Sequence, residues 1–223
     1  MKKIKHALIM AAGRGARMMP LTQVIPKPML PYQGTTLIAD GIKKIRPYVD
    51  NIYITVGYKG PALAEHVIEC GVNTVFNTSD KGNAWWIYNT MMKFIDEPTI
   101  VLTCDNVIEL DFEKLLLEYC AFNCPACMVV PVKPVSGLDG DYIFKENNVV
   151  TKFDRNEISD SYCSGIQVLS PYKINQLTNE TESFYSVWDQ LIMRKQVYSS
   201  NLYPKNWFAV DTIQQFSLLH NEK

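Results

Sequence analysis

The chain has 223 residues, enough to bury a sizeable hydrophobic core within one large domain. Its hydrophobic content of 47% and charged content of 20% are ordinary for a globular protein, and no apolar run approaches the roughly 20 residues that span a bilayer. The formal net charge of −1 provides no basic field, so neither nucleic acid nor a membrane is expected as a partner.

The N-terminus predicts a cytoplasmic protein, and this location bears on the state of the cysteines. The first residues are basic and then apolar, as in a secretion signal, but Gly13 and Arg14 end the apolar stretch before it reaches the roughly 7–15 residues of such a signal. In a reducing compartment the six cysteines are expected to be free thiols. Cys120, Cys124 and Cys127 have no histidine nearby, which favours buried small side chains over a zinc site.

The first predicted element is a buried strand over residues 7–11, and a glycine loop follows it. Gly13 and Gly15 flank Arg14, so the backbone N–H groups of this loop can approach an anion closely. Met18 stands where a dinucleotide fingerprint needs its third glycine, and this region holds no Gly-Lys-Ser/Thr tripeptide of the Walker type. A lone Gly-x-Gly would be read as a turn after an edge strand, so the residues that follow decide the matter.

The stretch over residues 13–28 resembles the signature of the nucleotidyltransferases that join a nucleoside triphosphate to a phosphorylated small molecule. That signature runs Gly-x-Gly-x-Arg-(Leu/Met)-x-Pro-Leu-Thr and then Pro-Lys-Pro, and every position is met here. The resemblance implies an α/β fold: a single Rossmann-like nucleotidyltransferase domain over residues 1–223, with a mostly parallel, mixed central sheet. It also implies that Arg17 and Lys27 are catalytic, with Arg17 on the triphosphate and Lys27 neutralising the α-phosphate and the entering phosphate.

The next elements alternate between helices and strands. Apolar residues at helical spacing predict a helix over residues 36–45, and a strand over residues 51–56 follows. A second helix is predicted over residues 62–68 and a short strand over residues 74–76. This order predicts right-handed crossovers and a mostly parallel sheet.

A polar loop over residues 77–81 leads to a helix predicted over residues 84–95, and family members hold the nucleotide base with the corresponding loop. The block that begins at Asn83 departs from the sugar-nucleotide pattern and resembles the Asn-Asn-Ile-Tyr-Ser stretch of bacterial phosphocholine cytidylyltransferases. An Asn side chain both donates and accepts, so Asn83 suits a base edge, whereas Tyr88 and one neighbouring tryptophan are expected in the core. The nucleotide-binding residues implied by the resemblance are Ala11, Ala12, Gly13, Arg14, Gly15, Asn77, Gly82, Asn83 and Cys104.

Asp105 follows an apolar strand predicted over residues 99–103, and the carboxyl end of such a strand borders the ligand crevice of an open α/β sheet. This position matches the family's first magnesium aspartate. Asp211 ends a second apolar stretch and resembles the family's late Asp-x-Asp-Thr element, although Ala209 replaces the first aspartate. A helix N-cap is the alternative for a single aspartate. The resemblance implies that Asp105 and Asp211 bind Mg²⁺, which takes one or two carboxylates plus phosphate oxygens and water.

The second half of the chain carries a weaker pattern. A helix over residues 112–119, capped by Asp111, and a strand over residues 126–131 are followed by a loop over residues 136–141 and a hairpin of residues 142–144 and 149–153. The family places its acceptor-binding residues just after this point. Lys152 is therefore expected to bind the acceptor phosphate, with Gly165 nearby, and a solvated surface lysine is the alternative.

A late block of aromatic and acidic residues completes the predicted acceptor site. In the phosphocholine enzymes a similar cluster surrounds the cationic head, and aromatic faces with a carboxylate suit an ammonium group. Tyr185, Trp188 and Asp189 are therefore assigned to the acceptor. A core helix through Trp188, Leu191 and Ile192 remains the alternative.

The resulting hypothesis is a Mg²⁺-dependent cytidylyltransferase, a monomer or homodimer, that joins CTP to a small phosphorylated acceptor and releases pyrophosphate. The enzymes it resembles act on phosphocholine or, in capsule phosphoramidate synthesis, on phosphoglutamine, which implies a role in cell-surface polysaccharide modification. The alternative is a sugar-1-phosphate guanylyl-, uridylyl- or thymidylyltransferase that makes a nucleotide sugar. A catalytically silent binding subunit is a third hypothesis, and the presence of both basic residues and both aspartates argues against it.

Overall fold

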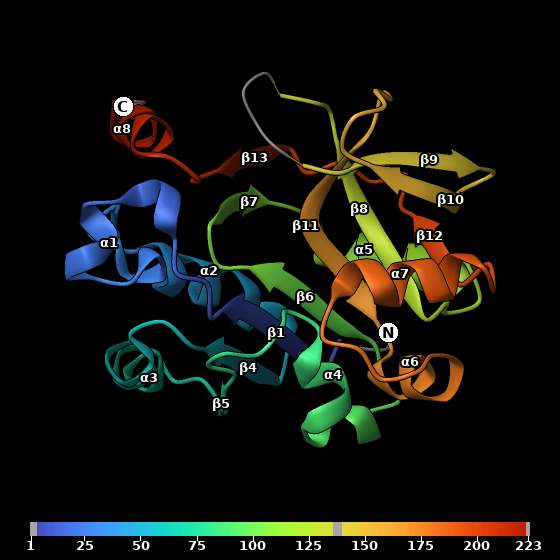
Figure 1. The fold of residues 1–223 in the computed structure, drawn as a ribbon, viewed down its shortest axis with the longest axis horizontal. Coiled ribbons are helices and arrows are strands. Elements are labelled where there is room, and N and C mark those ends of the chain that lie inside the picture. Colours follow the sequence, from blue (N-terminus) through green and yellow to red (C-terminus); the bar gives the residue numbers. More distant parts are fainter. Residues whose placement is uncertain (1–3, 136–139, 222–223) are drawn as a thin grey trace.

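In the computed structural model, which describes residues 4–135 and 140–221, the aliphatic runs of the sequence form one nine-stranded central sheet (Figure 1). Its strands are β1 His6–Ala11, β4 Asn51–Val56, β5 Thr74–Asn77, β6 Thr99–Thr103, β8 Cys127–Val132, β9 Tyr142–Glu146, β10 Val149–Asp154, β11 Tyr162–Leu169 and β12 Val197–Ser199. Two short pairs lie outside this sheet: β2 Pro31–Tyr32 with β3 Thr35–Thr36, and β7 Asn106–Glu109 with β13 Asn206–Ala209.

Helices cover both faces of the sheet. The α-helices are α1 Leu21–Val24, α2 Leu37–Ile45, α3 Gly60–Glu69, α4 Trp85–Asn89, α5 Phe112–Ala121, α6 Pro171–Leu177, α7 Phe184–Ile192 and α8 Ile213–Asn221, and the short 3₁₀ turns are η1 Ala16–Met18, η2 Lys27–Met29, η3 Arg46–Tyr48 and η4 Met91–Phe94. Apolar residues of α2, α3 and α5 pack on one face, and those of α4, α6 and α7 on the other (Figure 1). Within the described residues, none of these helices is long and apolar enough to cross a bilayer.

Helix α2 illustrates how the sequence pattern produces this packing. Its buried residues Ile38, Ile42 and Ile45 recur at helical spacing and are at most 3% exposed. Burying each such side chain contributes about 1.5–3 kcal/mol. Thr36 caps the helix, since its hydroxyl accepts a hydrogen bond from the N–H of Ala39 at 3.2 Å. The helix predicted over residues 36–45 is thus confirmed.

The sheet changes character along its width. Strands β5, β4, β1 and β6 run parallel to one another, as the alternating order of helices and strands predicts. Strand β11 then enters antiparallel between β6 and β8. The predicted α/β class with a mixed central sheet is confirmed, and the carboxyl ends of β1, β4 and β6 meet at one edge, where ligands bind in open α/β sheets.

The helix predicted over residues 84–95 is wrong in its extent. Helix α4 ends at Asn89, and Thr90 adopts extended backbone before η4 begins. The Thr90 hydroxyl donates to the carbonyl of Trp86 at 2.7 Å and accepts from the N–H of Met92 at 3.2 Å. Such local side-chain bonds compete with a continuous helix, which explains the break.

The ribbon of β7 and β13 lies outside the main sheet, and the sequence did not predict β7. Asn106 pairs with Ala209 in this antiparallel ribbon, and the N–H of Val210 donates to the carbonyl of Asp105 at 3.0 Å. Two distant parts of the chain are thereby joined at the edge of the sheet. Asp111 caps α5 as predicted, accepting from the N–H of Lys114. Of the loop predicted over residues 136–141, residues 136–139 lie outside the described part.

Candidate active site

The glycine loop after β1 is fastened to neighbouring backbone on both sides. The N–H of Tyr58 donates to the carbonyl of Ala12 at 3.0 Å, and the Tyr58 hydroxyl donates to the carbonyl of Thr22 at 2.9 Å. The Thr22 hydroxyl in turn donates to the carbonyl of Gly15 at 3.0 Å. The loop is therefore held between the end of β4 and helix α1, so its free N–H groups keep a fixed direction.

Gly15 is required because its backbone φ of +61° lies in the left-handed region. A Cβ at this position would lie 3.0 Å from Cβ of Lys27 and 3.2 Å from Cγ2 of Thr22. The missing side chain lets η2 pack directly against the loop. Lys27 is placed in this way beside the loop rather than out in solvent.

Lys27 lies at the centre of the site. Its Nζ is 2.7 Å from Oδ2 of Asp105 and 2.9 Å from Oδ1 of Asp211, and an Nη of Arg17 is 3.1 Å from the same oxygen of Asp211. The Lys27 side chain is 9% exposed. Burial alone would lower the pKa of Lys27, but attraction to the two carboxylates outweighs it and raises that pKa. Burial would raise the pKa of Asp105, and Lys27 holds it below its usual range.

The two carboxylates fit the magnesium role that the sequence suggests. Both approach one atom, Nζ of Lys27, so Asp105 and Asp211 converge on one small volume. In the described part of the chain no cluster of three or more His, Cys, Asp or Glu side chains could hold a metal. A pair of carboxylates with positions left for phosphate and water is the donor set that Mg²⁺ prefers.

A cavity of about 810 Å³ opens over the glycine loop and the ends of β1 and β4. We call it the nucleotide cleft. Its lining comes from the loop, the turn after β4, the polar loop before α4 and strand β6: Met10, Ala12, Gly13, Arg14, Thr55, Gly57, Tyr58, Thr78, Ser79, Asp80, Lys81, Gly82, Asn83, Trp86 and Thr103. A Cβ on Gly13 would meet no described heavy atom within 4 Å, so the loop presents an open backbone face here.

Two residues expected to bind the nucleotide have local structural roles. Asn77 is not among the described residues that line the cleft; its Oδ1 accepts from the N–H of Ser79 at 3.0 Å and fixes the polar loop. Gly82 does line the cleft, but a Cβ there would collide with the carbonyl oxygen of Glu182. Its N–H also donates to the Glu182 carboxylate at 2.8 Å. The glycine is thus needed for contact with the segment that precedes α7.

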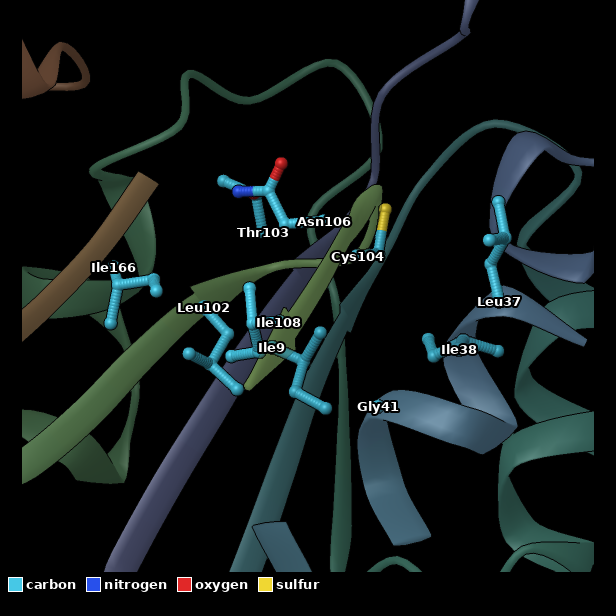
Figure 2. A pocket seen from close by; sticks show the side chains of 10 residues that line it. All are labelled: Ile9, Leu37, Ile38, Gly41, Leu102, Thr103, Cys104, Asn106, Ile108 and Ile166. Atoms are coloured by element: carbon cyan, nitrogen blue, oxygen red, sulfur yellow. The ribbon is translucent and has the colours of Figure 1, made fainter. Parts of the chain in front are cut away.

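The Cys104 side chain faces the core rather than the nucleotide cleft. It lines a small cavity of about 20 Å³. Figure 2 shows the Cys104 side chain among the residues that line this cavity, which include Leu37 and Ile38 of α2 and Leu102 of β6. Side chains alternate along a strand, so Thr103 is the residue that faces the cleft. Burial raises the pKa of the Cys104 thiol. A contact between Cys104 and a nucleotide is therefore restricted to its backbone.

A second cavity of about 270 Å³ lies beside the first and includes Arg17, Asp105 and Asp211. We call it the acceptor cavity. It shares Met10, Asn83 and Thr103 with the nucleotide cleft, so the two cavities meet along these residues. Asn83 sits at this junction, where its Oδ1 accepts from the N–H of Phe184 at 3.0 Å and caps α7.

The predicted acceptor residues divide into two groups. Gly165 and Trp188 line the acceptor cavity. Lys152 and Asp189 are not among the described residues that line it, and the Lys152 ammonium is 2.6 Å from both Asp154 and Glu157 on the surface. The expectation that Lys152 binds the acceptor phosphate is therefore corrected. Lys152 forms a surface ion pair, because the hairpin of β9 and β10 turns its side chain toward two neighbouring carboxylates.

Arg155 lines the acceptor cavity, as Arg17 does, and neither was predicted to bind the acceptor. Its Nε donates to Oδ1 of Asp141 at 3.1 Å and to the Tyr185 hydroxyl at 2.7 Å, and that hydroxyl donates to Asp141. Tyr185 thus supports the rim rather than lining the cavity. Burial and the hydrogen bond with Asp141 raise the pKa of Tyr185 to about 12. The sequence signal for Arg155 was a basic residue just past the hairpin, whereas Lys152 lies within its second strand.

Strand β11 bulges between Cys163 and Gln167, next to Asn106 of β7. Nδ2 of Asn106 donates to Oγ1 of Thr103 at 2.7 Å and to the carbonyl of Ser164 at 2.6 Å. Nε1 of Trp207 donates to the same carbonyl at 2.9 Å. Gly165, with φ of +80°, fits under this junction because a Cβ would lie 2.8 Å from Oγ1 of Thr103. Asn106 and Trp207, which sequence reasoning missed, therefore tie the acceptor cavity to β6 and β13.

Sequence comparison connects this arrangement with known proteins. A family model described as nucleotidyl transferase matches residues 6–154. The bifunctional protein GlmU of Methanocaldococcus jannaschii is 30% identical over 152 residues, which cover 68% of this chain and 36% of that protein. The mannose-1-phosphate guanylyltransferase catalytic subunit beta of Drosophila melanogaster is 22% identical over 213 residues, covering 88% and 57%. The chain spans about a third of the length of the first of these relatives.

Structural comparison extends over nearly the whole chain. The CTP:phosphocholine cytidylyltransferase of Streptococcus pneumoniae superposes with a TM-score of 0.76 at 21% identity, covering 99% of each chain. The inositol-1-phosphate CTP transferase of T. maritima gives a TM-score of 0.76 at 17% identity, covering 98% of this chain and 96% of that one. At these identities the similarity establishes a shared fold.

Proposed function

The chain belongs to the nucleotidyl transferase family, and from this premise we propose that it transfers a nucleoside monophosphate from a nucleoside triphosphate to the phosphate of a small acceptor. An oxygen of the acceptor phosphate bonds to the α-phosphorus, and the bond from that phosphorus to the β-phosphate oxygen breaks, so pyrophosphate leaves. The observation that carries the proposal is the Lys27 cluster. Asp105 and Asp211, which both pair with Lys27, line the acceptor cavity, and that cavity adjoins the nucleotide cleft.

The chain's own residues act by positioning and by neutralising charge, and no covalent enzyme intermediate is needed. The N–H groups of the glycine loop and the guanidinium of Arg17 hold the triphosphate and the departing pyrophosphate. Lys27 neutralises the α-phosphate and the entering phosphate. Family members generally use a divalent metal. Asp105 and Asp211 are the residues that would hold Mg²⁺, which would supply further neutralisation of negative charge on the phosphates.

For the acceptor phosphate, the structure favours Arg155 over Lys152. The Arg155 guanidinium lies in the acceptor cavity and keeps its orientation through Asp141 and Tyr185. A planar guanidinium binds phosphate or carboxylate with two parallel hydrogen bonds. Trp188 of the same cavity also suits the nitrogen-bearing part of an acceptor.

We assign CTP as the nucleotide and a small nitrogen-bearing phosphate, similar to phosphoglutamine or phosphocholine, as the acceptor. The resemblance of the block at Asn83 to cytidylyltransferases supports this assignment. The second candidate is a sugar-1-phosphate nucleotidyltransferase. The sequence similarity to GlmU and to a mannose-1-phosphate guanylyltransferase supports this candidate to the same degree.

A nucleotide panel tests the assignment. The protein is mixed with Mg²⁺ and CTP, UTP, GTP, dTTP or ATP, and both its melting temperature and pyrophosphate release with phosphorylated acceptors are measured. A ligand at 100 times its Kd stabilises the fold by about 2.7 kcal/mol, which moves the melting temperature by several degrees. CTP alone is expected to produce the shift. A shift with GTP, UTP or dTTP instead would support the sugar nucleotide candidate, and binding without turnover would support a silent subunit.

A further inference from the structure

The acceptor cavity has one side chain whose chemistry does not match its surroundings. Gln167 of β11 lines the cavity and is 4% exposed. Its strand neighbours are Val101 of β6 and Val129 of β8, and both belong to the apolar layer under α7. A buried amide costs free energy unless its donors and acceptors are all paired, so an aliphatic residue would be the simpler occupant.

The orientation of the Gln167 amide is defined by its partners. Oε1 accepts from Nε1 of Trp188 at 3.3 Å and from the thiol of Cys127 at 3.6 Å. An indole N–H can donate but not accept, so the amide oxygen must be the atom on the side of Trp188. Nε2 therefore points away from that contact, and it has no hydrogen-bond partner within residues 4–135 and 140–221.

We propose that Nε2 of Gln167 donates a hydrogen bond to the acceptor, and that the acceptor therefore carries a carbonyl, carboxylate or hydroxyl oxygen distant from its reacting phosphate. This inference rests on the proposed function and narrows its substrate class. A trimethylammonium head offers no such oxygen and would leave Nε2 unpaired. Such a site rejects ligands that lack the hydrogen-bonding group.

The charged residues of the cavity agree with this substrate class. Oδ1 of Asp141 already accepts from both Arg155 and Tyr185, so the carboxylate is not presented to a cation as an isolated charge. Arg155, like Nε2 of Gln167, is a donor without acceptor capacity. The cavity thus offers donors at two separate places, which suits a ligand with oxygens at both ends.

The competing explanation is that Gln167 only holds the Trp188 ring in place. Two variants separate the explanations. Gln167→Met keeps the approximate shape and removes the donor. Cys127→Ala is the matched control. It removes the thiol that donates to Oε1 of Gln167 and leaves Nε2 in place. Cys127 is also not among the described residues that line the cavity.

The experiment measures binding by calorimetry, with choline phosphate, O-phosphoserine, glycerol 3-phosphate and glucose 1-phosphate as probes. Wild-type protein is expected to bind at least one of the three oxygen-bearing phosphates more tightly than choline phosphate. Gln167→Met should lower the affinity for that probe by roughly tenfold to hundredfold, because one buried hydrogen bond is lost. The affinities for CTP and choline phosphate should be unchanged. Cys127→Ala should leave all affinities unchanged.

The proposal is overturned if choline phosphate binds best, if none of the oxygen-bearing phosphates binds, or if Gln167→Met leaves their affinity unchanged. An equal loss of CTP and acceptor affinity in Gln167→Met would also overturn it, because that result indicates a general structural role. Failure of the proposed function gives a different result. In that case wild-type protein releases no pyrophosphate with any nucleotide, whatever the outcome of the binding measurements.

Discussion

The nucleotide cleft and the acceptor cavity present different kinds of groups to their ligands. The nucleotide cleft presents an open stretch of backbone at Gly13, together with the residues of the polar loop before α4. The acceptor cavity is built from side chains that hydrogen-bond one another, among them Arg155 and Gln167. Phosphates of every nucleotide are alike and suit backbone recognition, whereas acceptors differ and require side-chain recognition.

Lys27 pairs with two aspartates that line the acceptor cavity, and its loss should have the largest effect. Lys27→Ala is expected to lower the rate of pyrophosphate release by about 10²–10³-fold, since it removes a fixed charge from the reacting phosphates. It should also lower the free energy of unfolding by about 3 kcal/mol, because Asp105 and Asp211 then lose their shared partner. Steady-state kinetics and thermal melting measure the two effects.

The control for this variant is Lys114→Ala, which removes an exposed lysine that pairs with Asp111. That substitution should change neither activity nor stability by a measurable amount. Added Mg²⁺ should raise the melting temperature of Lys27→Ala more than that of wild type, because the two carboxylates become free for the metal. Near-normal turnover in Lys27→Ala would contradict the role given to the cluster.

A glycine substitution in β11 should have the next largest effect, and it should affect the acceptor cavity but not the nucleotide cleft. Gly165→Ala places a Cβ 2.8 Å from Oγ1 of Thr103 and 2.9 Å from Nδ2 of Asn106 at a φ of +80°. We expect a loss of about 2–3 kcal/mol in unfolding free energy, from the left-handed backbone and the overpacking together. The KM of the acceptor should rise while that of the nucleotide stays unchanged.

Gly34→Ala is the matched control, since Gly34 has φ of +78° and a Cβ there meets no described heavy atom within 4 Å. It should show the backbone cost alone, about 1–2 kcal/mol, with normal kinetics. Equal melting temperatures for the two variants would mean that β11 relaxes around the extra carbon. The acceptor cavity would then not depend on close packing at Gly165, which would contradict the difference drawn between it and the nucleotide cleft.

The residues that the sequence predicted correctly lie close together along the chain, and those that it missed depend on contacts between distant segments. Arg17 and Lys27 lie within one continuous signature, so their type and spacing were readable without the fold. Strand β7 was missed because its pairing partner β13 is distant in sequence, and no local pattern reveals such a pair. Asp105 and Asp211 were nevertheless assigned as a pair, because each matches an aspartate position of the family that the signature resembles.

The acceptor half was harder to predict because its residues come from several elements. Lys152 and Arg155 are close in sequence and both basic, and the direction of each side chain depends on hairpin register. Cys104 adjoins Asp105, but strand alternation turns its side chain into the core. Sequence spacing shows that such residues are near the site, and packing decides which of them face it.

Arg155→Ala and Lys152→Ala test this distinction directly. Arg155→Ala should raise the acceptor KM by roughly tenfold to hundredfold, since a charged hydrogen bond in the cavity is lost. Lys152→Ala should leave it unchanged, because its ammonium is on the surface beside Asp154 and Glu157. The nucleotide KM is the internal control in both variants. A larger rise of the acceptor KM in Lys152→Ala than in Arg155→Ala would indicate that Lys152 binds the acceptor after all. It would contradict the assignment of Arg155 to the acceptor phosphate.

The smallest expected effect concerns the core beneath the site. Gly41 lies inside α2 beside the small cavity of Figure 2, and a Cβ there would meet no described heavy atom within 4 Å. Gly41→Ala should raise the free energy of unfolding by about 1 kcal/mol, because alanine restricts the unfolded chain and favours helix. Melting should rise by about 2–4 °C with unchanged kinetics for both substrates. A fall in activity without a fall in stability would show that α2 must move during turnover, so that neither half of the site is held as rigidly as its hydrogen bonds indicate.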